Sequence, residues 1–294
     1  MNGCQDRGMN RFSSYDATQI AFHEVGEGRP LVCLPGGPGR STEYFGDLGG
    51  LSESRRLVLL DTRGTGASAD AADPDSYRCD RLLADVEALH AHLAFEPIDV
   101  LGHSAGANLA VLYAAAHPER IDHLVLLTPS LLALGITVTD DQERSALQRR
   151  SGESWYASAM AAAERAQAGD DSAQTRNEYM PFLYGRWDQA AQDHVKLGMS
   201  ERARAVQTRF YADGVFDPPA TAATLTRLDA PVLVYGGELD VIPSAVLHQA
   251  ARVFPHAEVT VQPAAGHYPW LDGPARFTAA LNAFLSPAGM AAAS

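Results

Sequence analysis

The 294-residue sequence predicts an α/β fold, a mostly parallel sheet flanked by helices with a helical cap inserted after the sixth strand. Short apolar runs rich in β-branched residues alternate with longer segments of helical pattern, which is typical of a parallel sheet covered on both faces. The strand-like runs are apolar without alternation, as burial on both faces requires. Between about residues 131 and 227 the alternation stops, and only helix-like segments remain.

The elements follow in order along the chain. Two runs around Phe12–Tyr15 and Gln19–His23 predict an antiparallel hairpin at the sheet edge, with its turn at residues 16–18. The later strands are expected at Leu31–Leu34, Leu57–Leu60, Ile98–Leu101, His123–Leu127, Val232–Tyr235 and Val259–Val261. Core helices are expected at Asp80–Ala94, Ala107–His117, Ser244–Val253 and Pro274–Leu285, and cap helices at Asp140–Arg150, Ser154–Ala168, Trp187–Leu197 and Glu201–Tyr211.

This order of elements predicts two parts. Residues 1–130 and 228–294 should form the core, and residues 131–227 should form a cap over its catalytic face. The alternative is that the inserted helices are a second domain with a role of their own.

Composition restricts the partners. A net charge of −13 disfavours nucleic acid and anionic membranes, because their phosphates would be repelled. Three scattered cysteines, Cys4, Cys33 and Cys79, are too few for a disulfide framework or a zinc site. The first residues lack the apolar segment of a signal peptide, and no apolar run reaches transmembrane length. We therefore expect a cytoplasmic protein without nucleic-acid or membrane partners; the oligomeric state stays open.

The most informative motif is Gly102-His103-Ser104-Ala105-Gly106, between a predicted strand and a predicted helix. A strand that turns at once into a helix holds its turning residue in a strained, usually positive-φ conformation and leaves no room for side chains two residues away. Glycine at positions 102 and 106 meets that demand. Ser104 is then exposed at the turn as a candidate nucleophile.

A serine hydroxyl needs a base, and the base needs an acid to orient it. In this arrangement both follow the serine in the chain, each on a loop after a strand. Asp240 follows the strand at Val232–Tyr235, and Glu238 in the same loop is its competitor. His267 follows the last predicted strand in a glycine-containing loop, which favours it over the other nine histidines.

The carbonyl under attack also needs backbone N–H donors for its developing negative charge. Ala105, directly after the nucleophile, should provide one. The second should come from Pro35-Gly36-Gly37-Pro38-Gly39, after the strand Leu31–Leu34. Proline has no N–H group, so the donor is Gly36 or Gly37, and we favour Gly37.

With these residues in hand, the chain resembles the α/β-hydrolase superfamily over nearly its whole length, and more narrowly the proline iminopeptidase family. The resemblance rests on PGGPG at 35–39, DTRGTG at 61–66, GHSAG at 102–106, GGELD at 236–240 and AAGH at 264–267. It implies a helical cap and hydrolysis of an N-terminal residue or a small acyl compound without a metal or other cofactor. The chain has Pro35, Ala105 and Tyr268 where the family usually has histidine, tryptophan and a smaller residue.

The resemblance also implies that acids of the cap hold the free amine of the substrate. The acids available there are Glu153, Glu164, Glu178, Asp188 and Asp193. As substrate-binding candidates we name Gly36, Glu178, Trp187 and Tyr268.

The predicted function is that of a serine hydrolase similar to a proline iminopeptidase. It is expected to act through an acyl-enzyme on a small acyl or N-terminal aminoacyl substrate, which is a small molecule or a short peptide. One alternative is an esterase, lactonase, thioesterase or cyclase that acts on a small metabolite. Another is a non-catalytic ligand-binding protein with the same fold.

Overall fold

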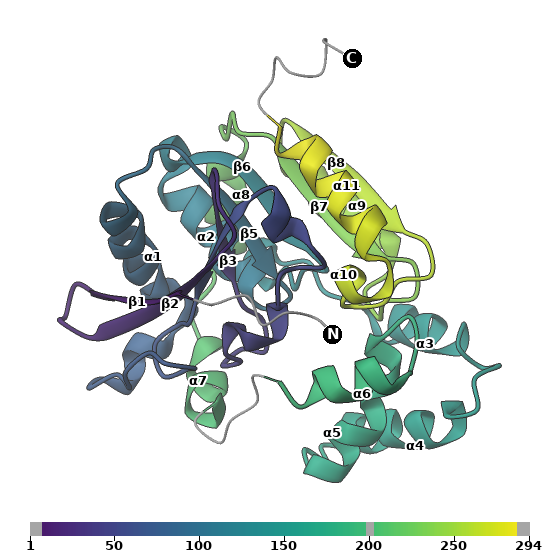
Figure 1. Ribbon diagram of the computed structural model, residues 1–294. Helices are drawn as coiled ribbons and strands as arrows, with labels where there is room; N and C mark the ends of the chain where they lie inside the picture. Colours follow the sequence, from purple (N-terminus) through teal and green to yellow (C-terminus); the bar gives the residue numbers. More distant parts are fainter. Residues whose placement is uncertain (1–7, 198–202, 287–294) are drawn as a thin grey trace.

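The computed structural model describes residues 8–197 and 203–286 and contains one eight-stranded sheet (Figure 1). The strand order is β1-β2-β4-β3-β5-β6-β7-β8; β2 runs antiparallel to β1 and β4, and the remaining neighbours are parallel. The strands are β1 (Gly8–Ser13), β2 (Gln19–Val25), β3 (Pro30–Leu34), β4 (Arg56–Leu60), β5 (Ile98–His103), β6 (Ile121–Leu127), β7 (Val232–Gly237) and β8 (Ala257–Gln262). The predicted sheet and its edge hairpin are confirmed.

Helices flank this sheet and fill the connection between β6 and β7. In the first half of the chain lie α1 (Cys79–Leu93) and α2 (Gly106–Ala116). Between β6 and β7 lie α3 (Asp140–Gln148), α4 (Tyr156–Gln167), α5 (Ala173–Tyr179), α6 (Gln189–Val195), α7 (Ala203–Phe210) and α8 (Pro218–Leu225). The chain continues with α9 (Ser244–Ala251), α10 (Pro269–Asp272) and α11 (Pro274–Phe284).

Alternate residues of the central strands face opposite layers of helices. In β3, Val32 and Leu34 belong to the cluster that contains α1, α2 and α9, whereas Leu31 and Cys33 belong to the cluster of α11. All four side chains are fully buried. Burial on both faces is the physical reason why these strands read as continuous apolar runs.

The inserted helices divide into two groups. Helices α3 to α6 gather beyond one end of the sheet, whereas α7 lies apart from them, against the short helix Pro74–Tyr77 (Figure 1). Across residues 8–197 and 203–286, the structure has no helix with the length and apolar character needed to cross a bilayer. The division into a core and a cap at residues 131 and 227 stays a prediction.

Three helices are absent from the sequence prediction. Helix α5 has seven residues and α10 has four, so neither is long enough to show a helical period. Helix α8 begins with two prolines, Pro218 and Pro219, which usually indicate a break but are tolerated in the first helical turn. Glu201, the expected start of the last cap helix, lies outside the described residues, where α7 begins at Ala203.

Candidate active site

Ser104 occupies the sharp turn between β5 and α2. Its φ is +52°, in the left-handed region, and its side chain is partly exposed. A Cβ atom at Gly102 would lie 2.7 Å from the Cα of Ala107, and one at Gly106 would lie 2.4 Å from the carbonyl oxygen of Leu34. Both glycines are therefore required by close packing of the helix on the strand and of the turn on β3.

Asp240 and His267 lie on the loops that follow β7 and β8. His267 Nδ1 lies 3.1 Å from both carboxylate oxygens of Asp240, and both side chains are buried. Because a carboxylate can only accept, Nδ1 donates, so in the uncharged form of the ring the lone pair lies on Nε2. Of the two acids that the sequence left open, Asp240 contacts the imidazole, whereas Glu238 accepts a hydrogen bond from the backbone N–H of Ala264.

Residues at the end of β6 form hydrogen bonds with both Ser104 and His267. Ser104 N–H donates to the carbonyl oxygen of Leu127 at 3.0 Å, and the Thr128 hydroxyl donates to the carbonyl oxygen of His267 at 3.0 Å. Within residues 8–197 and 203–286, the hydroxyl of Ser104 is not hydrogen-bonded to His267. Such contacts are often long in unliganded sites and tighten when substrate binds.

The turn after β3 differs between its two candidate donors. Gly36 is buried, and its N–H donates to the hydroxyl of Tyr44 at 2.8 Å. Gly37 is exposed, has a φ of +118°, and donates its N–H to no group among the described residues. The same holds for the N–H of Ala105 across residues 8–197 and 203–286. Gly37 and Ala105 therefore have backbone donors to offer a ligand, and Gly36 does not.

The structure adds residues that no motif indicated. Arg40, directly after the PGGPG turn, is buried and donates to the Tyr268 hydroxyl and to the carbonyl oxygens of His194 and Leu197. His194 Nε2 in turn lies 2.8 Å from the carbonyl oxygen of Tyr44. Burial lowers the pKa of His194 to about 4, so the ring is neutral at pH 7. These contacts join α6 to the turn after β3.

The other two loops of the site also contact the inserted helices. Arg149, at the end of α3, donates to the carbonyl oxygens of Glu238 and Asp240. His267 N–H donates to the carbonyl oxygen of Leu183 at 2.8 Å. The loops of Gly37, Asp240 and His267 are therefore each hydrogen-bonded to the segment between β6 and β7.

The remaining predicted substrate-binding residues lie in different surroundings. Glu178 on α5 accepts hydrogen bonds from Arg165 and Gln174. Trp187 packs its ring 5.5 Å from that of Tyr184. Tyr268 is buried with its hydroxyl on Arg40. None of the three is in contact with Ser104 among the contacts of the described residues, and their substrate-binding roles stay predictions.

A cavity of about 600 Å³ lies among α3, α4 and α5. Its lining combines apolar side chains with acids and arginines, and Glu143 within it accepts a hydrogen bond from the Tyr179 hydroxyl at 3.1 Å. The ring of Tyr179 packs in one cluster with Phe182 and Val241, and Val241 follows Asp240 in the chain. Tyr179 therefore connects the lining of the cavity to the cluster that includes the residue after Asp240, although the loops of Ser104, Asp240 and His267 contribute no residue to that lining.

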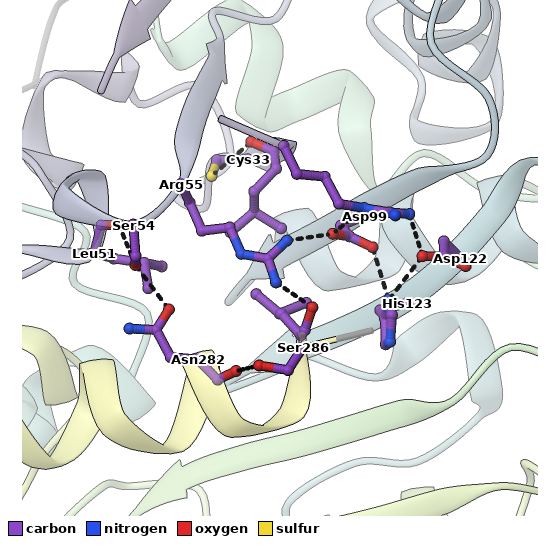
Figure 2. A network of polar contacts seen from close by, with 12 residues as sticks. Cys33, Leu51, Ser54, Arg55, Asp99, Asp122, His123, Asn282 and Ser286 are labelled. Atoms are coloured by element: carbon purple, nitrogen blue, oxygen red, sulfur yellow. Dashed lines mark hydrogen bonds and ion pairs between the residues drawn. The ribbon is translucent and has the colours of Figure 1, made fainter. Parts of the chain in front are cut away.

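A separate charged cluster lies at the amino ends of β5 and β6 (Figure 2). Asp99, Asp122 and His123 are close enough to surround a cation. However, Arg55 donates to Asp99 at 2.9 Å, and Arg29 pairs with both Asp99 and Asp122. Two guanidinium groups already balance the two carboxylates, so the cluster is explained as a brace between strands, at the end of the sheet opposite Ser104.

Comparison with known proteins gives one family and several relatives. A family described as alpha/beta hydrolase fold matches residues 29–274. A proline iminopeptidase of Levilactobacillus brevis is 26% identical over 292 residues, which cover 94% of this chain and 95% of that protein. The esterase RhEst1 of Rhodococcus sp. ECU1013 has a TM-score of 0.71 at 25% identity, covering 96% of this chain and 99% of that one. The esterase EaEST of Exiguobacterium antarcticum has a TM-score of 0.70 at 18% identity and covers 94% and 98%, respectively.

Proposed function

Because the chain belongs to the α/β-hydrolase family, we propose that this hydrolase forms an acyl-enzyme on Ser104, with His267 as the base and Asp240 as the acid that orients it. The observation that carries the proposal is the hydrogen bonding of His267 Nδ1 to both Asp240 oxygens at 3.1 Å, on loops at the end of the sheet where Ser104 turns. The pairing fixes the tautomer that a base acting through Nε2 needs.

The reaction follows from these positions. His267 Nε2 takes the hydroxyl proton as Ser104 Oγ attacks the substrate carbonyl, and Asp240 stabilises the imidazolium. The N–H groups of Gly37 and Ala105 donate to the oxyanion. His267 then gives its proton to the leaving group, and a water activated by the same ring releases the acyl group as an acid.

We favour an aminoacyl substrate, which the similarity to proline iminopeptidases over most of the chain supports. An aminopeptidase must pair the substrate ammonium with a carboxylate, since a buried unpaired cation is strongly penalised. The cavity among α3, α4 and α5 has three carboxylates in its lining, namely Asp140, Glu143 and Glu164. Glu143 is our candidate for the amine, because its partner Tyr179 packs against the same cluster as Val241, the residue after Asp240.

An esterase for neutral acyl groups is the second candidate. Most of the other cap acids are already engaged: Glu153 pairs with Arg150, Glu178 with Arg165, and Asp193 with Lys196. Asp188 accepts the N–H of Ala191 as the N-cap of α6. These contacts leave fewer carboxylates for an amine, and an esterase needs none.

The test is a panel of p-nitrophenyl esters and amino-acid p-nitroanilides, measured beside Ser104→Ala. We expect kcat to fall by about 10⁴- to 10⁶-fold in Ser104→Ala, with loss of fluorophosphonate labelling. Equal labelling of both proteins would contradict Ser104 as the nucleophile.

The same panel distinguishes the two substrate classes. Glu143→Gln should raise KM for aminoacyl substrates and spare acetyl esters, whereas Asp193→Asn, at a cap acid that pairs with Lys196, should change neither. If acetyl esters are cleaved as well as aminoacyl ones and both variants behave as wild type, the substrate is not an N-terminal amine.

A further inference from the structure

A chain of buried hydrogen bonds joins the turn of Gly36 to the loop of His267. Gly36 N–H donates to the Tyr44 hydroxyl at 2.8 Å, and that hydroxyl lies 2.8 Å from His103 Nδ1. His103 Nε2 lies 3.1 Å from the carbonyl oxygen of His267. Gly36, Tyr44 and His103 are all buried, so water does not compete for these bonds.

The proton positions along this chain follow from the partners. A carbonyl oxygen can only accept, so His103 Nε2 must carry a proton. Burial, with His267 and Arg40 nearby, lowers the pKa of His103 well below its usual range, so the ring is neutral and Nδ1 accepts. Tyr44 therefore donates to Nδ1 while its oxygen accepts from Gly36. Each group thus donates to the next, from Gly36 N–H through the Tyr44 hydroxyl and His103 to the carbonyl oxygen of His267.

Gly36 lies close to Ser104, the proposed nucleophile. A Cβ atom at Gly36 would lie 2.8 Å from the Cβ of Ser104 and 3.2 Å from His103 Nδ1. The rings of His103 and His267 pack with centroids 5.0 Å apart. The Gly36 N–H is engaged by Tyr44, whereas the next N–H, that of Gly37, has no acceptor among the described residues.

We propose that Tyr44 and His103 are positioning residues that set the separation of the Gly36–Gly37 turn from the His267 loop around Ser104. The inference rests on the proposed acyl-enzyme function. Neither residue contacts the substrate; Tyr44 orients the oxyanion donor, and His103 links that turn to the backbone of the base.

The first test is Tyr44→Phe, which keeps the ring and removes the hydroxyl. Gly36 N–H and His103 Nδ1 then lose their partner in a buried place, and we expect kcat to fall about tenfold with KM unchanged. The split follows because oxyanion donors act in the transition state rather than on bound substrate. The matched control is Tyr113→Phe, which removes the hydroxyl of an equally buried tyrosine on α2; that hydroxyl donates to Glu87 on α1 at 2.9 Å.

The second test is a double-mutant cycle with His103→Phe. If the chain acts as a unit, the double variant should lose no more kcat than His103→Phe alone, and additive losses would overturn the inference. Fluorophosphonate labelling of wild type and Ser104→Ala is measured first. Absence of label at Ser104 contradicts the proposed function; a labelled enzyme in which Tyr44→Phe and Tyr113→Phe have equal kcat overturns the positioning role alone. If His103→Phe does not fold, the kcat of Tyr44→Phe compared with that of Tyr113→Phe still tests the positioning role.

Discussion

Substituting Gly106 by alanine should lower the activity of this protein much more than its stability. Gly106 is the first residue of α2, and a Cβ atom there would lie 2.4 Å from the carbonyl oxygen of Leu34 and 2.6 Å from that of Pro35. Real Cβ atoms essentially never approach other atoms within 3.0 Å. The turn that begins at Pro35 must therefore move away from the start of α2 by at least about 0.6 Å.

That displacement determines the expected magnitudes. Overpacking costs about 1–3 kcal/mol of unfolding free energy, partly offset by about 1 kcal/mol because alanine favours the helix. Gly36 and Gly37 follow Pro35 directly, so the proposed oxyanion donor moves with the turn. Loss of one such donor costs about 10²- to 10³-fold in kcat, and we expect Gly106→Ala to lose about 10²-fold.

The assay is kcat for a p-nitrophenyl ester, measured with the unfolding free energy from urea titration. The control is Gly152→Ala, because a Cβ atom there would meet nothing within 4 Å. We expect the control to match wild type in both measurements. Folded Gly106→Ala with kcat within twofold of the control would refute the argument that this glycine sets the position of the turn.

Two further predictions concern stability. Burial lowers the pKa of His194 to about 4, so between about pH 6.5 and 4 the unfolded chain binds a proton that the folded chain does not, and the unfolding free energy should fall with falling pH by up to about 3 kcal/mol. In urea titrations at pH 7 and 5, the unfolding free energy of His194→Asn should depend less on pH than that of wild type. An equal pH dependence in the two proteins would contradict the assignment. Asp85→Asn should cost about 3 kcal/mol of unfolding free energy while kcat per folded enzyme is unchanged. The fully buried Arg63 then loses the carboxylate that it contacts at 2.5 Å and 2.7 Å and keeps as carboxylate partner only the partly exposed Asp16, at 2.8 Å. A urea midpoint equal to wild type would count against this buried pair.

The sheet and the three loops of the candidate site could be predicted from the sequence alone. Period and composition are local properties, so the strands around Leu31, Leu57 and Ile98 could be read from apolar runs. The glycines around Ser104 are equally local, because each is required by the turn on which it lies. The expectation that the acid and the base each lie on a loop after a strand indicated Asp240 and His267, and the structure brings their side chains into contact.

Contacts between side chains that are far apart in the sequence became visible only in the folded structure. Arg40 contacts Tyr268, 228 positions later, and His194 contacts the backbone of Tyr44, 150 positions earlier. Neither pair has a spacing or composition that distinguishes it from an ordinary surface residue or core aromatic. The short helix α5 and the acids that line the cavity depend on the same packing. These contacts exist because the inserted helices fold back onto the ends of the strands, and that geometry is not encoded in any single stretch of the chain.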